Sequence, residues 1–367
     1  MDRSQIIKKV LAQLDRPVLG KALVGVDGYI DRIQHPVKAQ LDIGNSHFPT
    51  LEDFGGHIIK AAGKSAQVEL DTSIIKPGGN APIMSHAMGA VGISTTCLGT
   101  LGEGEPQGVF RSMSKNCELL TLGKPAESNA LEFNDGKLIL SDLSSFARMD
   151  WHLVKDQVGL DQLRRLTEDC DVLALVGWCN PPHATAIWRG MLEEVIAFMD
   201  KKPKVFFDLA DPSKKSDEQI IEVVNLMNEY AQTTEVILGL NENETIKLYH
   251  AFERVDGKRA GLQDLPEICQ YVFEQMEIKT LVVHPLDRCL VTDIGGTRRL
   301  SGKLVDKPKV STGGGDNFNA GFCYGLLAGL PVEECMALAM ATSGAYVQNG
   351  NSPGISELKE FLEEMKN

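Results

Sequence analysis

The chain has few aromatic residues, no long apolar run and no surplus of positive charge. Aromatic residues make up 6% of its 367 residues, and acidic residues outnumber basic ones 50 to 37, which gives a formal net charge of -13. No basic stripe is present that could release counterions from nucleic acid, so we expect no nucleic acid partner. No apolar run is long enough to cross a bilayer or to form a signal peptide, so we expect a cytoplasmic protein without a membrane partner.

Several motifs with well-understood chemistry are also absent. The eight cysteines form no CxxC pair, which favours a reduced protein with scattered buried thiols. The eight histidines show no HExxH spacing, and we therefore expect no zinc site. There is no GxSxG elbow of a serine hydrolase and no GxxxxGK[ST] loop of a Walker-type nucleotide site.

Short apolar runs alternate instead with helical stretches along most of the chain. We predict strands over residues 22–26, 94–99, 172–176, 205–208, 235–240 and 280–284. We predict helices over residues 81–91, 183–199, 217–230 and 265–277. Such a repeated strand–helix order predicts an α/β fold, in which a mostly parallel sheet is covered by helices on both faces.

Two polar or alternating regions interrupt this order and predict a second, smaller unit. We assign residues 1–30, 73–102 and 151–367 to an α/β body, and residues 31–72 and 103–150 to a small β lid. The second insertion contains Asn134-Asp135-Gly136 between two short alternating runs, a strong signal for a hairpin. An exposed sheet edge on such a lid is a place where a second subunit would pair, so we expect a homodimer.

A run of three glycines, Gly313 to Gly315, precedes Asp316 and a helical stretch. Glycines let backbone N–H groups approach an anion, and the start of a helix favours negative charge. An aspartate here would repel a static phosphate, unless it accepts the proton of a hydroxyl that attacks phosphorus. An ordinary glycine turn with Asp316 as a helix cap is the structural alternative.

A second glycine cluster, Gly78-Gly79-Asn80, stands before another helical stretch. Its carboxamide could bind sugar hydroxyls, because it both donates and accepts hydrogen bonds; Asn80 could equally be only a helix cap. Upstream, Asp27 and Asp31 follow a strand, and α/β sheets bind ligands at such strand ends.

Two further strand ends carry acidic or amide side chains. Asp208 ends a predicted strand, and Asn241 follows the next one, with Glu244 three residues later. By residue type alone, Asn241 and Glu244 form a capping box at the start of a helix.

The glycine run resembles the C-terminal signature of the ribokinase-like (PfkB) carbohydrate and nucleoside kinases, G-A-G-D-x-F-x-x-G-F-x-x-G-L. The matching positions are Thr312, which precedes it, and Gly313, Gly315, Asp316, Phe318, Gly321, Phe322, Gly325 and Leu326. Gly314 replaces the usual alanine, and Val310 stands where the family usually has an aspartate. The resemblance spans nearly the whole chain and implies a three-layer α/β/α sandwich with a small β-sheet lid.

The resemblance also implies roles for the other motifs. Gly78, Gly79 and Asn80 match the glycines and asparagine that line the acceptor pocket, although Ile83 replaces a second asparagine of that signature. Asp31 best matches the aspartate that binds acceptor hydroxyls, and Asp27 is its rival.

The nucleotide side matches the family less closely. Asn241 and Glu244 match the N-x-x-E motif, whose glutamate holds magnesium through water, and Asp208 and Thr312 lie on the nucleotide side. The loop from His284 to Cys289 lacks the usual glycines, and Met340 stands where many members have a base-contacting asparagine.

Taken together, the motifs predict an ATP-dependent kinase that phosphorylates a hydroxyl of a sugar or sugar-like molecule. Asp316 would be the base, and the backbone N–H groups of Gly313, Gly314 and Gly315 would form the anion hole. The implied cofactors are ATP and Mg²⁺, and the fold allows a monovalent cation. Two alternatives stay open: a nucleoside kinase, which the low aromatic content disfavours, and a sugar- or nucleotide-sensing protein with little turnover.

Overall fold

The larger of two sheets holds nine strands in a computed structural model that describes residues 2–257, 261–310 and 312–366. In spatial order the strands are β14 (Gly296–Ser301), β13 (Arg288–Asp293), β12 (Thr280–Val283), β11 (Val236–Leu240), β10 (Lys204–Asp208), β9 (Val172–Leu175), β1 (Lys21–Gly25), β5 (Ser94–Gly99) and β6 (Cys117–Thr121). All neighbours from β12 to β6 are parallel, while β13 and β14 add antiparallel pairs at one edge. The predicted, mostly parallel sheet is confirmed.

Helices cover both faces of this sheet because alternate strand residues point into two separate apolar clusters. Leu173 and Leu175 belong to one cluster, and Val172 and Ala174 to the other. The first face carries α4 (Trp151–Val158), α5 (Leu160–Asp169), α6 (Ala184–Gly190), α7 (Asp217–Ala231), α8 (Glu242–Asp256) and α9 (Leu265–Glu274). The second carries α1 (Arg3–Gln13), α3 (Asn80–Ala90), α10 (Gly314–Leu327), α11 (Val332–Asn349) and α12 (Ile355–Glu364). The predicted three-layer sandwich is therefore confirmed.

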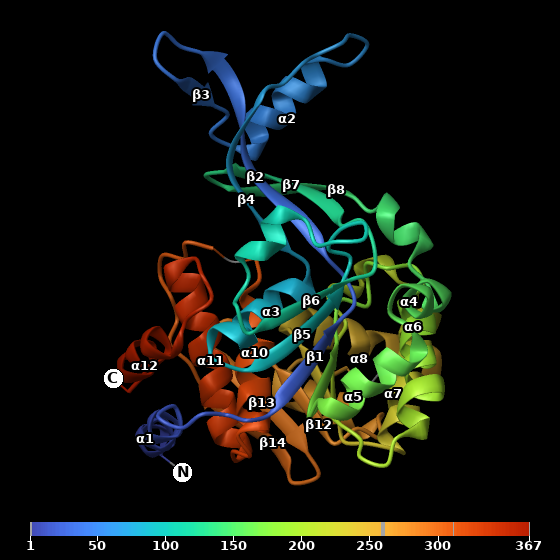
Figure 1. Cartoon of the computed structure of the whole chain (residues 1–367). Helices are drawn as coiled ribbons and strands as arrows, with labels where there is room; N and C mark the ends of the chain where they lie inside the picture. Colours follow the sequence, from blue (N-terminus) through green and yellow to red (C-terminus); the bar gives the residue numbers. More distant parts are fainter. Residues whose placement is uncertain (1, 258–260, 311, 367) are drawn as a thin grey trace.

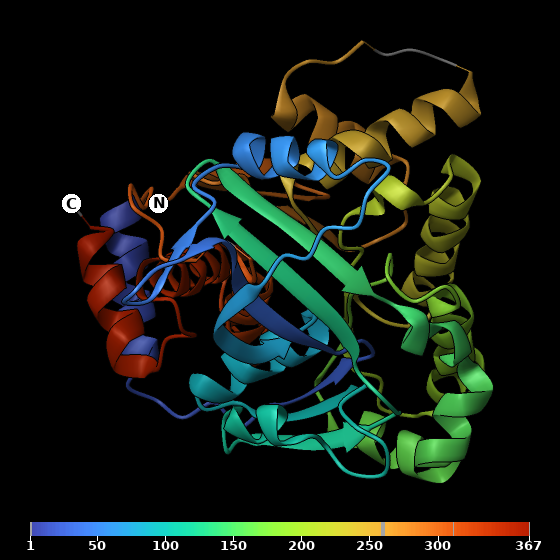
Figure 2. The ribbon, with the colours of Figure 1, turned by 90° about the horizontal axis from the view of Figure 1, so that it is seen from above.

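A smaller sheet stands above the body (Figure 1). It consists of β2 (Tyr29–Gln40), β3 (Asn45–His47), β4 (Leu70–Gly78), β7 (Ala126–Phe133) and β8 (Gly136–Asp142), with helix α2 (Leu51–Lys60) beside them. Seen from above, β7 and β8 cross over the middle of the body (Figure 2). They pair antiparallel across the turn at residues 134–135, which confirms the predicted hairpin. Phe48, Phe54 and Leu131 form a small apolar cluster of their own in this unit.

Two segments belong to a different sheet from the one that the predicted domain boundaries give them. Residues 73–78 were assigned to the body, but they continue β4 and pair with β2. Residues 117–121 were assigned to the lid, but they form β6 and pair in parallel with β5. The boundaries are corrected accordingly, because backbone pairing with a distant strand decides the membership of these short segments.

Five short helical turns complete the described chain: η1 (Gly108–Ser112), η2 (Ser144–Arg148), η3 (Met191–Val195), η4 (Ile196–Phe198) and η5 (Pro212–Lys214). The helix predicted over 183–199 is regular only as α6, since η3 and η4 replace its second half. In the part of the chain that is described, no helix combines the length and the apolar character needed to cross a membrane.

Candidate active site

A cavity of about 730 Å³ lies between the small sheet and the body. From the small sheet it is lined by Tyr29, Asp31, Ile33, Ile74, Lys76, Ser128, Ala130, Glu132, Lys137, Ile139 and Ser141. From the body it is lined by residues that include Gly79, Asn80, Ile83, Asn180, Asp208, Asp211, Asn241, Glu244, His284, Val310, Thr312, Gly313, Gly315 and Asp316. Most of the predicted site residues therefore meet in one place, at the carboxyl ends of the parallel strands, where open α/β sheets bind ligands.

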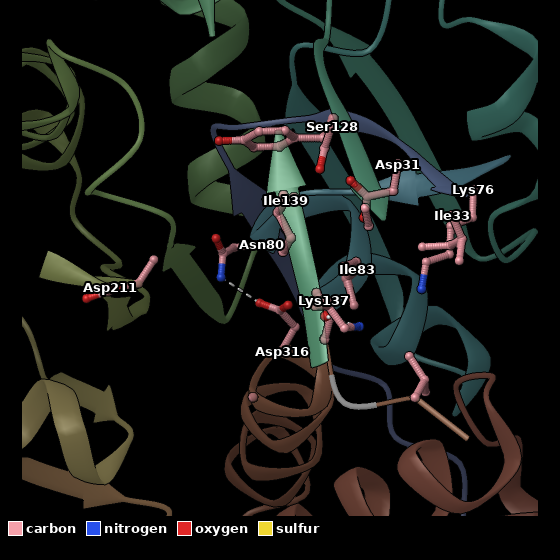
Figure 3. Close-up of a pocket in the computed structure, with 18 of the residues that line it drawn as sticks. Asp31, Ile33, Lys76, Asn80, Ile83, Ser128, Lys137, Ile139, Asp211 and Asp316 are labelled. Atoms are coloured by element: carbon pink, nitrogen blue, oxygen red, sulfur yellow. Dashed lines mark hydrogen bonds between the residues drawn. The ribbon is translucent and has the colours of Figure 1, made fainter. Parts of the chain in front are cut away.

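Asp316 and Asn80 connect the two glycine clusters directly. Asn80 is the first residue of α3, and Asp316 lies in the first turn of α10. The Asn80 Nδ2 atom donates a hydrogen bond of 2.9 Å to Oδ1 of Asp316, across 236 positions of the sequence (Figure 3). The N-terminal ends of two helices thus meet in the cavity, and Asp316 is a buried carboxyl group inside it rather than a cap.

The turn that opens α10 is fixed by two side chains. Gly313 is the residue before the helix and has a φ of 93°, a conformation that suits glycine. The Tyr346 hydroxyl donates to the carbonyl oxygen of Thr312 at 2.8 Å, and Asn317 Nδ2 donates to that of Gly313 at 2.9 Å. The first N–H groups of a helix have no partner within it, so this turn can present donors to an anion.

The three glycines of this turn do not share one environment. Gly313 and Gly315 line the cavity, whereas a Cβ atom on Gly314 would lie 3.4 Å from Val347 of α11. A Cβ atom on Gly313 would lie 2.8 Å from the Tyr346 hydroxyl. Position 313 therefore requires glycine, because its φ angle is positive and because a side chain there would collide with the Tyr346 hydroxyl.

Asp27, the rival acceptor ligand, lies beneath helix α3 and not in the cavity. Its two carboxylate oxygens accept the backbone N–H groups of Asn80 and Ala81 at 3.0 and 2.8 Å, and the residue is fully buried. Burial raises the pKa of Asp27 to about 7, against the lowering effect of these two N–H donors. The predicted acceptor role of Asp27 is corrected to a capping role, because both oxygens are used to fix the start of α3.

Asp31 lines the cavity from strand β2. Its cross-strand neighbours are Lys76 on β4 and Ser128 on β7. Burial raises its pKa, while the charge of Lys76 and a hydrogen bond from Ser128 lower it. A Cβ atom on Gly78 would lie 2.4 Å from the Asp31 carboxyl group, so Gly78 leaves room for Asp31 and does not itself line the cavity.

Asp208, Asn241 and Glu244 form a polar group at the ends of β10 and β11. The capping box is present, since Asn241 Oδ1 accepts the Glu244 N–H at 2.9 Å and Glu244 Oε2 accepts the Asn241 N–H at 2.8 Å. Asp208 accepts the Ala210 N–H at 2.8 Å and Nδ2 of Asn319 at 2.7 Å. All three line the cavity, so a structural role and a ligand-facing position coexist.

Burial raises the pKa values of the carboxyl groups of the site, and the charge of Asp208 raises two of them further. Burial and then the charge of Asp208 raise the pKa of Glu244 to about 8, and the same two causes raise that of Asp316. Burial also raises the pKa of Asp208. A divalent cation would relieve this repulsion, and oxygen ligands of this kind fit Mg²⁺.

The described residues contain no group of three or more His, Cys, Asp or Glu side chains that could enclose a metal ion. Mg²⁺ is commonly held by one or two carboxylates together with water and substrate phosphates. The arrangement around Asp208 and Glu244 fits that mode of binding.

The loop after β12, which lacks the usual glycines, brings a histidine into the cavity. His284 lines the cavity, and its ring lies 4.6 Å from that of Phe318 and beside Gly315. Burial lowers the pKa of His284 to about 4, so its imidazole is neutral at neutral pH. Met340 is buried in α11, next to Gly302.

Several cavity residues were missed by the sequence analysis. Lys76, Ser128, Glu132 and Lys137 all face the cavity from the small sheet. A signal existed for two of them: Glu132 and Lys137 flank the predicted hairpin turn, and they pair in register.

Comparisons with known proteins agree with this fold and extend it. Residues 4–365 match the family model described as prokaryotic ketohexokinase. A ketohexokinase of Haloferax volcanii is 26% identical over 348 residues, which cover 93% of this chain and 90% of that protein.

Two solved structures share the fold at low identity. A protein described as a sugar kinase from Rhizobium etli CFN 42 has a TM-score of 0.66 at 16% identity, over 94% of this chain and 98% of that one. A protein described as a ribokinase II from E. coli, solved in complex with ATP and Mg²⁺, has a TM-score of 0.63 at 12% identity, over 94% of this chain and all of that one. The family match covers every residue that lines the cavity, and it confirms the predicted class of carbohydrate kinase: the chain belongs to the prokaryotic ketohexokinase family.

Proposed function

We propose that this protein transfers the γ-phosphoryl group of ATP to a hydroxyl of a ketohexose. The relative from Haloferax volcanii is named for this acceptor class, and the neighbour from E. coli was solved with ATP and Mg²⁺. The observation that carries the proposal is the hydrogen bond between Asn80 and Asp316, because it unites an acceptor-side group with a buried carboxyl group in one cavity.

In this proposal, Asp316 accepts the proton of the attacking hydroxyl. The hydroxyl oxygen forms a bond to the γ-phosphorus, and the bond from that phosphorus to the bridging oxygen breaks as ADP leaves with the electron pair. The N–H groups of Gly313, Gly314 and Gly315 stabilise the charge on the transferring oxygens at the start of α10.

The acceptor is held by Asp31, Asn80 and Gly79, which line the cavity next to Asp316. A carboxylate can accept hydrogen bonds from two hydroxyl groups of a sugar, which would orient the attacking one. Gly78 contributes by making room for Asp31.

Asp208, Glu244 and Asn241 are the residues that would hold Mg²⁺, with Thr312 beside the phosphates. A bound Mg²⁺ neutralises phosphate charge and orients the phosphates for in-line transfer. Positive charge near Asp316 would also counteract the effects of burial and of the Asp208 charge, which raise its pKa, and so favour the basic form of this carboxyl group. A monovalent cation and a homodimer stay predictions.

Turnover with a panel of acceptors tests the proposal. Ketohexoses, aldohexoses, sugar acids and nucleosides are offered with ATP and Mg²⁺, and ADP release is measured. We expect turnover with ketohexoses. Release with nucleosides alone would favour a nucleoside kinase, and ATP–Mg²⁺ binding without release for any acceptor would favour a sensing protein.

The variant Asp316→Asn tests the assignment of the base. It keeps the size of the side chain and removes its basicity, so acceptor binding measured by calorimetry should persist while turnover falls by orders of magnitude. Asp293→Asn on β13, outside the cavity, serves as the matched control. Full activity of Asp316→Asn would end the assignment.

A further inference from the structure

The cavity-facing side of the small sheet is organised in three rows of side chains. Cross-strand register places Lys76, Asp31, Ser128 and Ser141 in a polar row. The next row, two residues further along each strand, is apolar and contains Ile74, Ile33, Ala130 and Ile139. The third row is the pair of Glu132 and Lys137. All ten residues line the cavity, so this face is built toward the ligand space.

Lys137 reaches from the third row to the catalytic turn of the body. Its Nζ atom lies 3.4 Å from Oγ1 of Thr312, and Thr312 directly precedes the glycines that open α10. Figure 3 shows Lys137 and Asp316 near the start of this helix. A cation that belongs to the small sheet thus lies beside the proposed anion hole of the body.

The contacts of Lys137 leave its ammonium group able to bind a further partner. The distance from Lys137 Nζ to Glu132 Oε1 is 3.5 Å, so its contacts with Glu132 and Thr312 both lie at the long end for hydrogen bonds to an ammonium group. An ammonium group has three donors, and the Lys137 side chain is 28% exposed. Closer phosphate oxygens would therefore be better acceptors than the present neighbours.

The cavity is rich in acidic side chains, and a cation such as Lys137 would offset their negative charge. Asp208, Glu244 and Asp316 are all acidic and all line the cavity, and a transferring phosphoryl group would add further negative charge. Of the other cavity lysines, Lys76 faces Asp31 in cross-strand register, and the charge of Asp31 acts on it. Lys137 is the lysine with a hydrogen bond to the turn before Gly313.

We propose that Lys137 is a catalytic residue of the phosphoryl transfer, a cation from the small sheet that donates hydrogen bonds to the transferring oxygens. This inference rests on the proposed function. The hydroxyl proton goes to Asp316, the acceptor oxygen bonds to phosphorus, and ADP leaves with the electron pair of the broken bond. The negative charge on the transferring group is shared between the backbone donors and Lys137.

The test compares Lys137→Met with Lys137→Arg. Loss of one preorganised donor to a transition state costs about a hundredfold in kcat, whereas the KM for the acceptor should change little. Lys137→Arg keeps the charge and should recover part of the loss. Lys64→Met removes an exposed lysine of the other insertion, outside the cavity, and should behave as wild type.

A binding experiment gives a second readout that does not depend on turnover. ADP, Mg²⁺ and aluminium fluoride imitate the transferring group, and their joint affinity is measured by calorimetry with a ketohexose present. Lys137→Met should weaken binding of this mixture strongly, while binding of ADP–Mg²⁺ alone stays unchanged. Thermal unfolding of each variant shows whether the fold persists, and Lys137→Gln repeats the test with a polar side chain if the Met variant is destabilised.

The outcomes separate the two proposals. An active wild type with an equally active Lys137→Met overturns the role of Lys137 alone. A wild type that releases no ADP with any acceptor overturns the proposed function, and the aluminium fluoride experiment then still decides whether Lys137 binds a transferring-group mimic. A wild type that neither turns over nor binds the mixture overturns both.

Discussion

The Tyr346 hydroxyl donates a hydrogen bond of 2.8 Å to the carbonyl oxygen of Thr312, which ties helix α11 to the turn that opens α10. Tyr346 is buried, and its hydroxyl also limits the space at Gly313. The position of the proposed anion hole therefore depends on a side chain that lies 34 residues further along the chain.

Tyr346→Phe should reduce catalysis more than stability. It removes one buried hydrogen bond, which costs about 1 kcal/mol of unfolding free energy, and it loosens the turn next to Asp316, so kcat should fall about tenfold. Urea unfolding and ADP release measure the two effects. The control is Tyr230→Phe. It deletes a buried hydroxyl that donates to the backbone carbonyl oxygen of Trp188, on the other face of the sheet. A similar loss of stability with unchanged activity is expected there, and equal kcat losses in both variants would contradict the role of Tyr346.

Substitution of Asp27 should reduce stability, whereas substitution of Asp31 should raise the KM for the sugar. Asp27→Ala leaves the start of α3 without its acceptor, so the unfolding free energy should fall by about 1–2 kcal/mol. Asp31→Asn keeps the fold and removes a charged acceptor from the cavity, so the KM for the sugar should rise at least about tenfold. Thermal unfolding and steady-state kinetics measure the two effects. A stable Asp27→Ala protein with a raised KM would return Asp27 to the acceptor pocket.

Stability without ligand should fall as the pH rises from about 5 to about 8. The pKa of Glu244 is raised from its ordinary 4.5 to about 8, and that of Asp27 from 3.8 to about 7. Between the ordinary and the raised pKa values, the folded protein keeps protons that the unfolded chain has released. Folding is therefore less favourable at the upper end of this window.

Urea unfolding at both ends of this pH window, with and without Mg²⁺, measures the effect. Mg²⁺ should stabilise the protein more at the upper end, where the carboxyl groups are ionised. Glu244→Gln should show a shallower dependence on pH and a smaller response to Mg²⁺. A response to Mg²⁺ that is the same in Glu244→Gln and wild type would rule out Glu244 as part of the metal site.

Local patterns were sufficient to predict the body and the centre of the site. The strands of the large sheet are short apolar runs that alternate with helices, and few folds accommodate this order of elements. Asp316, Asn80 and Glu244 were predicted because each follows a glycine turn or a strand end within a few residues. Their meeting in one cavity follows from the common carboxyl edge of a parallel sheet.

The family resemblance favoured Asp31 over Asp27 as the acceptor ligand, but residue type alone could not separate them, since both acids follow the same strand and the backbone path decides which one faces the cavity. Membership of β4 and β6 likewise depends on pairing with distant strands. Lys137 could have been placed from the hairpin register, but its contact with Thr312 requires the position of the small sheet on the body.

The capping role of Asp27 has a mechanical consequence. Asp27 lies in the short connection between β1 of the body and β2 of the small sheet, and the helix that it caps begins directly after β4 returns from the small sheet. Both of these crossings therefore meet at the start of α3, beside Asn80. Asp27 thus holds two crossings and the start of α3 together, so the groups proposed to position the reacting hydroxyl lie where the small sheet joins the body.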